Sequence, residues 1–293
     1  MTTQRTKSQP PKQTMLLQKA KTREIFLLGF FLLFYTAASQ AEFFRWTDKQ
    51  GKTHYSDKAA ISSQKITIQP GYAFYRVKKI YDGDTITLQS GERVRLLGIN
   101  TPEIESRHKR GEPGGLAAKN WLAKKLQKQK IRLVKDQTKR DKYGRLLAHL
   151  FTESGQHINL ELVKNGLATA NIHPPNLKYE ESLLSAQQEA EKNRLGIWGI
   201  PNYKPQPIEK IKSRKYSGWG RFTGRIASFK KGRKFDRLYF SSTTDLRIPT
   251  KSRALFPALK EYVGKQVEVR GWPSRRKNHC SILIRHPSAI ITQ

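Results

Sequence analysis

Oxygen-bearing side chains gather within residues 80–103, on two segments that predict the strands of a hairpin. Asp82 and Asp84 open the first strand, and the second ends in an Asn-Thr-Pro-Glu run at 100–103. Residues two apart share a face of a strand, so the open end of the hairpin brings Asp84 beside Asn100, Thr101 and Glu103. Oxygen ligands at one rim are what a hard cation such as Ca²⁺ requires. This stretch therefore predicts cation binding.

Two arginines accompany these oxygen atoms. Arg93 and Arg95 lie on the return strand. Arg95 falls on the face of that strand opposite to its apolar residues. An arginine close to an oxygen cluster is what a phosphate group requires, because the guanidinium fork matches two phosphate oxygens. The combination predicts chemistry on a phosphate.

The register of the hairpin follows from its apolar residues. A loop over 90–92 would set Ile86 opposite Leu96 and Leu88 opposite Val94, which gives one continuous apolar face. Each part also has a simpler interpretation: Asp-Gly-Asp as a turn, a strand arginine as a solvated edge, and Thr-Pro-Glu as a helix start.

The joint order of three motifs is more specific than any of them alone. Asp-Gly-Asp-Thr, then Arg-Leu-Leu-Gly-Ile-Asn-Thr-Pro-Glu, then the Asp-Lys-Tyr-Gly-Arg run at 141–145 resembles the staphylococcal nuclease (thermonuclease) family. The resemblance covers about residues 72–199. It implies hydrolysis of phosphodiester bonds in DNA and RNA, with Ca²⁺ as the cofactor.

The resemblance implies catalytic roles for three residues. Arg95 and Arg145 match the two arginines that bind the non-bridging phosphate oxygens, and their bonds strengthen as charge develops in the transition state. Glu103 matches the residue that orients and deprotonates the attacking water.

The implied metal and substrate contacts come from the same motifs. Asp84 and the backbone carbonyl of Thr101 match the Ca²⁺ ligands, with Asp82 as a neighbour that does not touch the ion. Lys142 and Tyr143 fall where the family contacts a terminal phosphate, and a solvated loop is the alternative for both.

Asn100 departs from the family pattern, which has an aspartate as the second carboxylate on the metal. The Asn carbonyl oxygen can still act as a ligand, but the site loses one negative charge and is expected to hold Ca²⁺ less tightly. Two aromatic residues that flank the nucleotide in the family are replaced around Asn171 and His173. His108 and His173 have no partner pattern for a metal or a triad and are expected on the surface.

Composition sets the wider limits. The 293 residues carry a formal net charge of +33, from 56 Lys and Arg against 23 Asp and Glu. A surface so basic attracts polyanions such as DNA, RNA or anionic lipid, and charge alone does not choose among them. Cys280 is the single cysteine, which excludes an intrachain disulfide.

The N-terminal part predicts a secretory signal at 1–41. Basic residues precede an apolar run of 11 at 25–35, and small residues precede a cut after Ala41. Met15 is an alternative start, and an uncleaved anchor in the inner membrane is the alternative to cleavage. The expected location is periplasmic or secreted, with transient membrane contact through the signal.

Five further segments follow the signal. We expect a small β-hairpin module at 42–58, a linker at 59–71, the nuclease-like domain at 72–199, a basic linker at 200–217 and a basic β-rich domain at 218–293. The hairpin module resembles one found after the signal of many bacterial envelope proteins.

The predicted fold class is α+β, a five-stranded OB-type β-barrel with three helices. Apolar periodicity and Gly or Pro boundaries predict the strands and helices. The strands are expected at 72–80, 84–89, 92–98, 131–134 and 146–151, and the helices at 113–126, 158–165 and 179–194. The order of these elements matches the family's barrel.

The sequence of the C-terminal domain predicts a small β-barrel, and an OB-like barrel is one possibility. Its strands are expected at 221–229, 237–241, 266–272 and 281–285, with a helical stretch near 254–262. Residues 206–293 hold 21 Lys and Arg against 5 Asp and Glu, with interleaved aromatic residues. The aromatic and basic residues suit a surface on which bases stack and to which backbone phosphates bind. Alternatively, the aromatic residues form the core of the domain. They are Tyr216, Trp219, Phe222, Phe229, Phe235, Tyr239 and Trp272.

Three functions compete on these data. The first is a secreted or periplasmic Ca²⁺-dependent nuclease with little sequence specificity. The second is a non-catalytic nucleic-acid-binding protein on the same fold. The third is an envelope protein whose charge binds anionic lipid or wall polymers. Nucleic acid is the expected partner, no protein partner is inferred, and a monomer is expected.

Overall fold

The computed structural model describes residues 43–48, 50–60, 62–66, 73–105, 110–213 and 218–293. The chain divides into two compact units, Met1–Gly71 and Tyr72–Gln293. The predicted signal segment at 1–41 and His108 lie outside the described residues. Within the described part, no helix has the length and apolar character needed to cross a membrane.

The N-terminal unit contains a three-stranded antiparallel sheet in the order β2-β1-β3. Strands β1 (Phe43–Thr47) and β2 (Thr53–Ser56) form the predicted hairpin, and Gly51 at its turn takes a φ of 81°. Strand β3 (Gln64–Ile66) pairs with the free edge of β1. The segment 59–71 was expected to be a linker only, so the structure corrects that prediction. The open edge of a two-stranded hairpin accepts a third strand readily.

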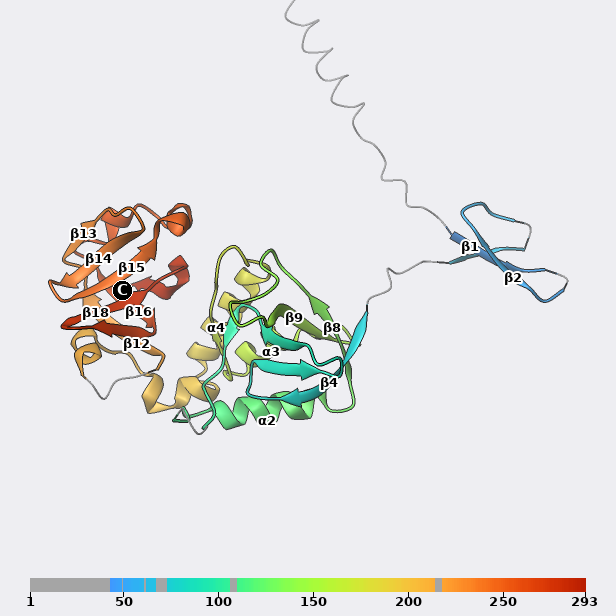
Figure 1. The fold of residues 1–293 in the computed structure, drawn as a ribbon, viewed down its shortest axis with the longest axis horizontal. Coiled ribbons are helices and arrows are strands. Elements are labelled where there is room, and N and C mark those ends of the chain that lie inside the picture. The colour runs from blue at the N-terminus through green and yellow to red at the C-terminus, as the bar shows by residue number, and fades with distance from the viewer. Residues whose placement is uncertain (1–42, 49, 61, 67–72, 106–109, 214–217) are drawn as a thin grey trace, which may run out of the picture. The chain divides into compact units, whose positions relative to one another are not determined.

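A closed five-stranded barrel forms one side of the second unit, and the C-terminal sheets form the other (Figure 1). Its strands follow one another in the order β4-β5-β6-β9-β8. They are β4 (Phe74–Ile80), β5 (Thr85–Leu88), β6 (Arg93–Leu96), β8 (Lys130–Val134) and β9 (Leu146–Thr152). The predicted OB-type α+β fold is confirmed.

The predicted register of the β5–β6 hairpin is wrong by two residues. Ile86 pairs with Val94, not with Leu96, and the Leu88 N–H donates to the Glu92 carbonyl at 2.9 Å. Gly91 has a φ of 87° and closes a three-residue loop over 89–91. Such loops place a glycine in the left-handed region. A shift of two residues keeps each side chain on its face, so the apolar face survives.

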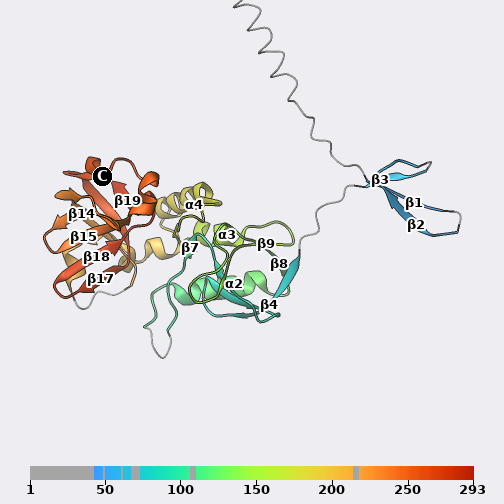
Figure 2. The same cartoon turned by 45° about the horizontal axis from the view of Figure 1, so that its top comes forward.

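Three α-helices pack around the barrel, as predicted. They are α2 (Gly115–Leu126), α3 (Ile158–Lys164) and α4 (Glu180–Lys192). Figures 1 and 2 show α2 running alongside the barrel strands. It buries Ala118, Leu122 and Leu126, which recur at helical spacing. Leu122 and Leu126 join Ile86, Val94 and other strand residues in one apolar core.

A two-stranded ladder beside the barrel was not predicted. β7 (Ile99–Asn100) pairs with β10 (Thr169–Ala170), and this sets Asn100 opposite Thr169. The ladder joins the segment that follows the β5–β6 hairpin to the segment before α4.

The C-terminal strands form two sheets, in the orders β11-β12-β16-β19 and β13-β14-β15-β18-β17. No closed barrel is described among residues 206–213 and 218–293, so the structure corrects the prediction of a small barrel. The first sheet consists of β11 (Gln206–Pro207), β12 (Gly220–Arg225), β16 (Gln266–Gly271) and β19 (Ile290–Thr292). The second consists of β13 (Ser228–Lys230), β14 (Phe235–Ser241), β15 (Thr244–Pro249), β17 (Pro273–Arg276) and β18 (His279–Leu283).

Part of the predicted linker at 200–217 belongs to this C-terminal domain. β11 pairs in parallel with β12, and Ile208 and Ile211 are buried in the C-terminal core with Phe222. Burial of these two apolar side chains explains why the segment folds instead of remaining a connector. Short 3₁₀ helices complete the domain and its approach. They are η1 (Gly196–Gly199), η2 (Pro201–Tyr203), η3 (Ile208–Lys212), η4 (Thr250–Leu255), η5 (Leu259–Tyr262) and η6 (Pro287–Ala289).

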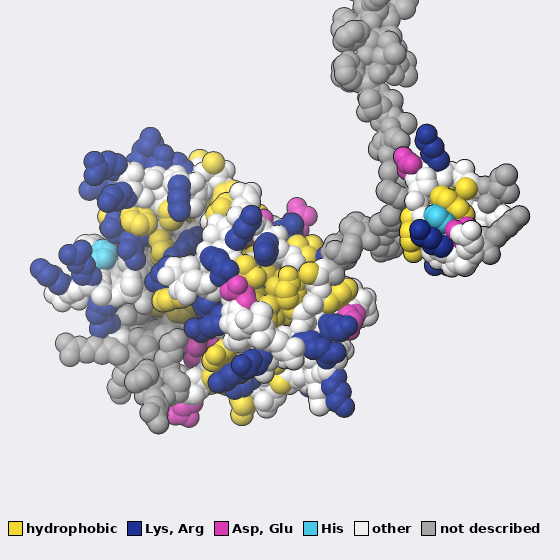
Figure 3. Space-filling view, turned by 45° about the vertical axis from the view of Figure 1, so that its right-hand side comes forward, with side chains coloured by type: hydrophobic (Ala, Val, Ile, Leu, Met, Phe, Trp, Pro, Cys, Tyr) yellow, Lys and Arg dark blue, Asp and Glu magenta, His cyan; other side chains and the backbone are white. Residues whose placement is uncertain are grey.

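The interleaved aromatic residues divide between core and surface. Phe222 is fully buried, whereas Trp272 keeps 40% of its surface exposed. Tyr216 lies outside the described residues. Lys and Arg side chains predominate over Asp and Glu on the face shown in Figure 3.

Candidate active site

A cavity of about 460 Å³ opens at the rim of the barrel, beside the β5–β6 hairpin. Eight of the nine predicted site residues line it, together with Thr85 and Arg93. The eight are Asp82, Asp84, Arg95, Asn100, Thr101, Glu103, Tyr143 and Arg145. Lys142 is absent from the lining, and its ammonium lies 4.9 Å from the centre of the Tyr143 ring.

Asp84 forms the buried floor of the cavity, with 5% of its surface exposed. Its Oδ2 accepts the Thr101 N–H at 2.9 Å and pairs with Arg95 Nη2 at 2.8 Å. Its Oδ1 accepts the Thr85 hydroxyl at 3.1 Å. Burial raises the pKa of Asp84 to about 6, against the lowering effect of Arg95, and the nearby Asp82 raises it further.

Arg95 is fixed by backbone and side-chain acceptors. Its Nη1 donates to the Leu96 and Ile99 carbonyls at 3.0 and 3.1 Å. Its Nη2 donates to Asn100 Oδ1 at 3.1 Å and also contacts Asp84. The guanidinium is therefore held in one orientation at the edge of the cavity, which limits the entropy that it loses when it binds a phosphate.

Asn100 and Thr101 have their oxygen atoms engaged by the protein. Asn100 Oδ1 accepts from Arg95, and its Nδ2 donates to the Thr101 carbonyl at 3.0 Å. These are two of the oxygens expected to bind the metal, in addition to the carboxylate of Asp84. A cation at this position has to compete with Arg95 and to turn the Asn100 amide.

The donor set agrees in kind with a calcium site but is low in charge. Carboxylate, amide and backbone oxygens are the ligands that Ca²⁺ takes. Asp82, Asp84, Asn100 and Thr101 supply all three kinds within one cavity. No group of three or more His, Cys, Asp or Glu side chains placed to hold a metal occurs among the described residues. The few charges here suit weak cation binding.

Arg145 is placed by a loop that Asp141 organises. Asp141 Oδ1 accepts the N–H groups of Tyr143 and Arg145, and its Oδ2 accepts from Arg145 Nε at 2.7 Å. Backbone N–H groups that converge on an Asp side chain stabilise a tight turn. Arg145 Nη1 reaches Thr85 Oγ1 at 3.4 Å. The same turn therefore directs the guanidinium into the cavity.

Glu103 lines the cavity where the chain leaves β7. Its N–H donates to Glu112 Oε2 at 3.0 Å, and its carbonyl accepts the Glu112 N–H at 2.8 Å. A Cβ on Gly115 would stand 2.5 Å from the Glu103 carbonyl oxygen. The start of α2 thus packs directly against the Glu103 backbone and sets its position.

Two lining residues were not assigned a role from the sequence. Thr85 contacts both Asp84 and Arg145, and Arg93 shares its strand face with Arg95. The signal for Arg93 was present, because side chains two apart on a strand point the same way. Thr85 belongs to the Asp-Gly-Asp-Thr motif, so its position beside Asp84 was visible as well.

A five-stranded OB-type barrel with an arginine- and carboxylate-lined rim defines the class of protein, and sequence comparisons agree with it. Residues 93–199 match the model of the staphylococcal nuclease homologue family, and residues 30–73 match a domain of unknown function (DUF4124). The chain therefore belongs to the staphylococcal nuclease family.

Three relatives illustrate the similarity, each over 127 residues and 42% of this chain. A thermonuclease of Staphylococcus intermedius is 43% identical, and a thermonuclease of Staphylococcus hyicus is 35% identical, each with 75% of its length covered. An endonuclease of Bacillus subtilis is 35% identical, with 60% of its length covered.

Proposed function

We propose that the protein is a nuclease that hydrolyses phosphodiester bonds of DNA and RNA with little sequence specificity. The supporting observation is the single cavity that brings Arg95 and Arg145 together with Asp84 and Glu103. The names of the relatives, thermonuclease and endonuclease, agree with this reaction.

The proposed reaction is attack of water on phosphorus. Glu103 accepts a proton from the water while the water oxygen bonds to phosphorus. The bond from phosphorus to one ester oxygen breaks, that oxygen takes up a proton from solvent water and leaves as a hydroxyl, and Glu103 returns its proton to solvent. Arg95 and Arg145 bind the non-bridging oxygens, whose negative charge grows in the transition state.

The two arginines contribute differently. Arg95 already donates four contacts through Nη1 and Nη2, so its Nε–H is the donor left for a phosphate unless it releases Asp84. Arg145 uses Nε on Asp141 and Nη1 on Thr85. Within the described residues the Nη2 of Arg145 has no hydrogen-bond partner. Arg145 therefore has more N–H groups available for the substrate than Arg95 has.

Calcium is the proposed cofactor, bound by the oxygens of Asp84, Asn100 and Thr101 with Asp82 nearby. When bound, the cation supplies positive charge that offsets the charge on the transferring phosphoryl group. Asp84 is the chain's main contribution, because it is the one buried carboxylate in the cavity.

A non-catalytic nucleic-acid-binding protein on this fold is the alternative. The cavity favours the enzyme, because a binding module needs neither a carboxylate at the position of Glu103 nor a buried acid at the position of Asp84. A protein that binds only lipid or wall polymers would use surface charge and gives no reason for this cavity.

A metal-titrated cleavage assay tests the proposal. The purified mature protein is incubated with plasmid DNA, single-stranded DNA and RNA over a range of Ca²⁺ concentrations. We expect degradation of all three that requires the cation and stops with chelator. Binding of nucleic acid without cleavage at any Ca²⁺ concentration would favour the alternative.

We also propose that the protein acts in the periplasm or outside the cell, as a monomer. The support is the apolar run and small residues at 25–41. N-terminal sequencing of envelope and medium fractions is expected to show a mature chain that begins at Glu42. An intact N-terminus in the membrane fraction would favour an uncleaved anchor.

A further inference from the structure

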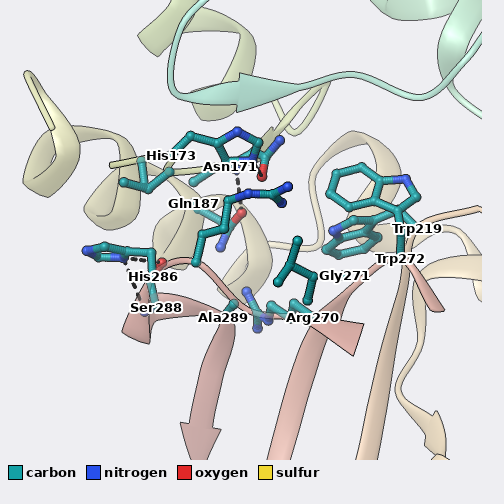
Figure 4. Close-up of a pocket in the computed structure, with 14 residues that line it drawn as sticks. Asn171, His173, Gln187, Trp219, Arg270, Gly271, Trp272, His286, Ser288 and Ala289 are labelled. Atoms are coloured by element: carbon teal, nitrogen blue, oxygen red, sulfur yellow. Dashed lines mark hydrogen bonds between the residues drawn. The ribbon is translucent and has the colours of Figure 1, made fainter. Parts of the chain in front are cut away.

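A second, narrow cleft of about 40 Å³ lies where the C-terminal sheets meet the barrel domain. Asn171 and His173 line it from the segment after β10, and Trp219 and Trp272 line it from the C-terminal domain (Figure 4). Arg285 is a further lining residue. The cleft therefore combines cationic and aromatic groups from both domains.

Arg285 carries a charge that the protein leaves uncompensated. It is half-buried, and among the described residues it has neither an ion pair nor a hydrogen bond. Burial lowers the pKa of Arg285, and the nearby Arg247 lowers it further. The Nε of Arg247 is also buried without a hydrogen-bond partner. A half-buried cation beside another cation is costly, and a bound anion removes that cost.

The other arginine in the lining, Arg270, has its positive charge balanced by acidic side chains. Arg270 pairs with Glu191 and with Glu268, through contacts of 2.8 and 2.7 Å. No acid is placed in this way for Arg285 among the residues that the structure describes. Arg270 therefore holds the two domains together, and Arg285 remains available to a ligand.

The lining residues connect this cleft to the active-site cavity. Asn100 lines the active-site cavity and also a small cavity that Trp219 lines, and Trp219 in turn lines the cleft. The β7–β10 ladder places Asn100 two residues from Asn171 through its partner Thr169. The cavity and the cleft therefore lie along one short run of residues, from Asn100 through Thr169 to Asn171.

His173 lines the cleft, and charged groups of both sites act on its pKa. His173 keeps much of its surface in solvent, yet its pKa is lowered to about 4, by burial of the ring and then by Arg285 and Arg95. Arg285 lines the cleft and Arg95 lines the active-site cavity, so positive charge from both sites acts on this residue.

We propose that the cleft binds the single-stranded nucleic acid that extends from the active-site cavity. Arg285 contacts a backbone phosphate, and Trp272 stacks on a base. The cleft is too narrow for a base, so stacking occurs on the exposed 40% of Trp272 at its rim. The inference rests on the proposed nuclease function and gives the C-terminal domain a role in holding the substrate.

The test compares a long and a minimal substrate. Arg285→Gln and Trp272→Ala are assayed on a 16-nucleotide single-stranded DNA and on a labelled dinucleotide that reaches only the active site. We expect each variant to raise the KM for the 16-mer about tenfold, as for the loss of one phosphate contact or one stacked base. The kcat on the 16-mer and both constants on the dinucleotide are expected to stay within about twofold.

A matched charge change supplies the control. Arg233 is an exposed arginine on the C-terminal domain, between β13 and β14, and does not line the cleft. Arg233→Gln removes the same charge and is expected to change the KM for the 16-mer less than twofold. Arg285→Lys and Trp272→Phe are expected to recover most of the lost affinity.

The outcomes separate this inference from the proposed function. A parent protein that cleaves neither substrate contradicts the nuclease function itself. A parent that cleaves both, with Arg285→Gln no different from Arg233→Gln, contradicts the cleft. Loss of dinucleotide cleavage in Arg285→Gln would mean that Arg285 supports the fold, and this outcome also contradicts the proposal.

Discussion

Arg145 and Arg95 occupy the same cavity but differ in how much of the surrounding structure depends on them. Arg95 donates to the carbonyls of Leu96 and Ile99, so its removal leaves backbone acceptors without a partner. Arg145 lies on a turn whose Asp141 also accepts backbone N–H groups. The two alanine variants should therefore separate catalysis from stability.

Arg145→Ala is expected to lower kcat by two orders of magnitude or more, because a contact to the transition state is lost. Its thermal midpoint should change little, whereas Arg95→Ala should lower both kcat and the midpoint. Arg140→Ala, an exposed arginine on the same loop that pairs with Glu92, is the control. A folded Arg145→Ala variant with full activity would refute the role given to Arg145.

Asn100→Asp tests the departure from the family pattern. The added carboxylate should raise the affinity for Ca²⁺ and shift the metal titration of activity to lower concentration, while maximal turnover changes less. Asn120→Asp, on the exposed face of α2, adds the same charge away from the site. If the titrations of the Asn100→Asp variant and the parent coincide, residue 100 is not a ligand. Activity in excess chelator would remove calcium from the mechanism.

The resemblance of three motifs to the family was sufficient to predict eight of the lining residues, because the motifs bring their own local geometry. The hydrogen bonds were not predictable. Asn100 turns its oxygen to Arg95 and its Nδ2 to the Thr101 carbonyl, and that choice depends on where the β7 backbone lies. The sequence shows that Asn100 can be a metal ligand. It does not show that Arg95 already binds the oxygen that the metal would need.

At the level of elements, β9 and α3 bring two histidines into an aromatic cluster. His149 Nδ1 lies 3.1 Å from His157 Nε2, and both rings contact Tyr179. Burial and then the neighbouring His157 lower the pKa of His149 to about 3. Burial and then Lys164 lower the pKa of His157 to about 4. Asp136 and Lys178 are the other charged groups that act on His149.

These shifts predict a loss of stability in mild acid. The folded pKa values lie below 6.5, so the unfolded chain binds these protons more tightly, and stability falls as pH falls from about 6.5 towards 4. Between pH 7 and 5, His149 alone should account for about 2 kcal/mol. Urea unfolding of the parent and of His149→Gln at both pH values measures this difference.

The control for this prediction is His54→Gln, in the N-terminal unit. It should leave the pH dependence of unfolding of the barrel unchanged. Asp84 acts in the opposite direction, because its raised pKa favours the folded state in acid, but it contributes equally to parent and variant. An equal loss of stability in parent and His149→Gln would contradict the assignment.

The helices were predictable from their apolar spacing and, for α3 and α4, from the glycines that follow them. Gly166 follows α3 with a φ of 63°, and a Cβ there would stand 2.1 Å from the Leu195 carbonyl oxygen. The β7–β10 ladder was not predictable, because two residues per strand carry no periodicity. The prediction of the hairpin register was wrong for a related reason. A shift of two residues keeps the same side chains on the apolar face, so the apolar pattern cannot distinguish the two registers.

At the level of the whole molecule, composition predicted the order of the domains better than their borders. Pro and Lys between 200 and 217 suggested a connector, yet Ile208 and Ile211 enter the C-terminal core. Two isolated apolar residues in a basic stretch do not show the periodicity that predicts a helix or a strand. Their burial becomes evident only when the sheet that covers them is known. The contacts between the domains were equally hidden, because each partner looks like an ordinary surface charge.

Glu191 is the residue in α4 that joins the two domains. Its Oε2 accepts from Arg270 Nη2 at 2.8 Å and lies 3.6 Å from Arg221 Nη2. Both arginines also pair with Glu268, and both guanidinium groups lie over the ring of Trp198. The network is largely buried, so removal of one acid leaves positive charge that Glu268 alone must balance.

Glu191→Gln is therefore expected to destabilise the contact between the domains by about 1–3 kcal/mol, the usual loss for a hydrogen bond to a charged group. In calorimetry, unfolding of the C-terminal sheets should separate from that of the barrel and shift about 4–8 °C lower for each kcal/mol lost, the range for a domain of this small size. Glu181→Gln, an exposed acid on the same helix, should behave as the parent. An unchanged single transition in Glu191→Gln would show that the two domains are held together without this network.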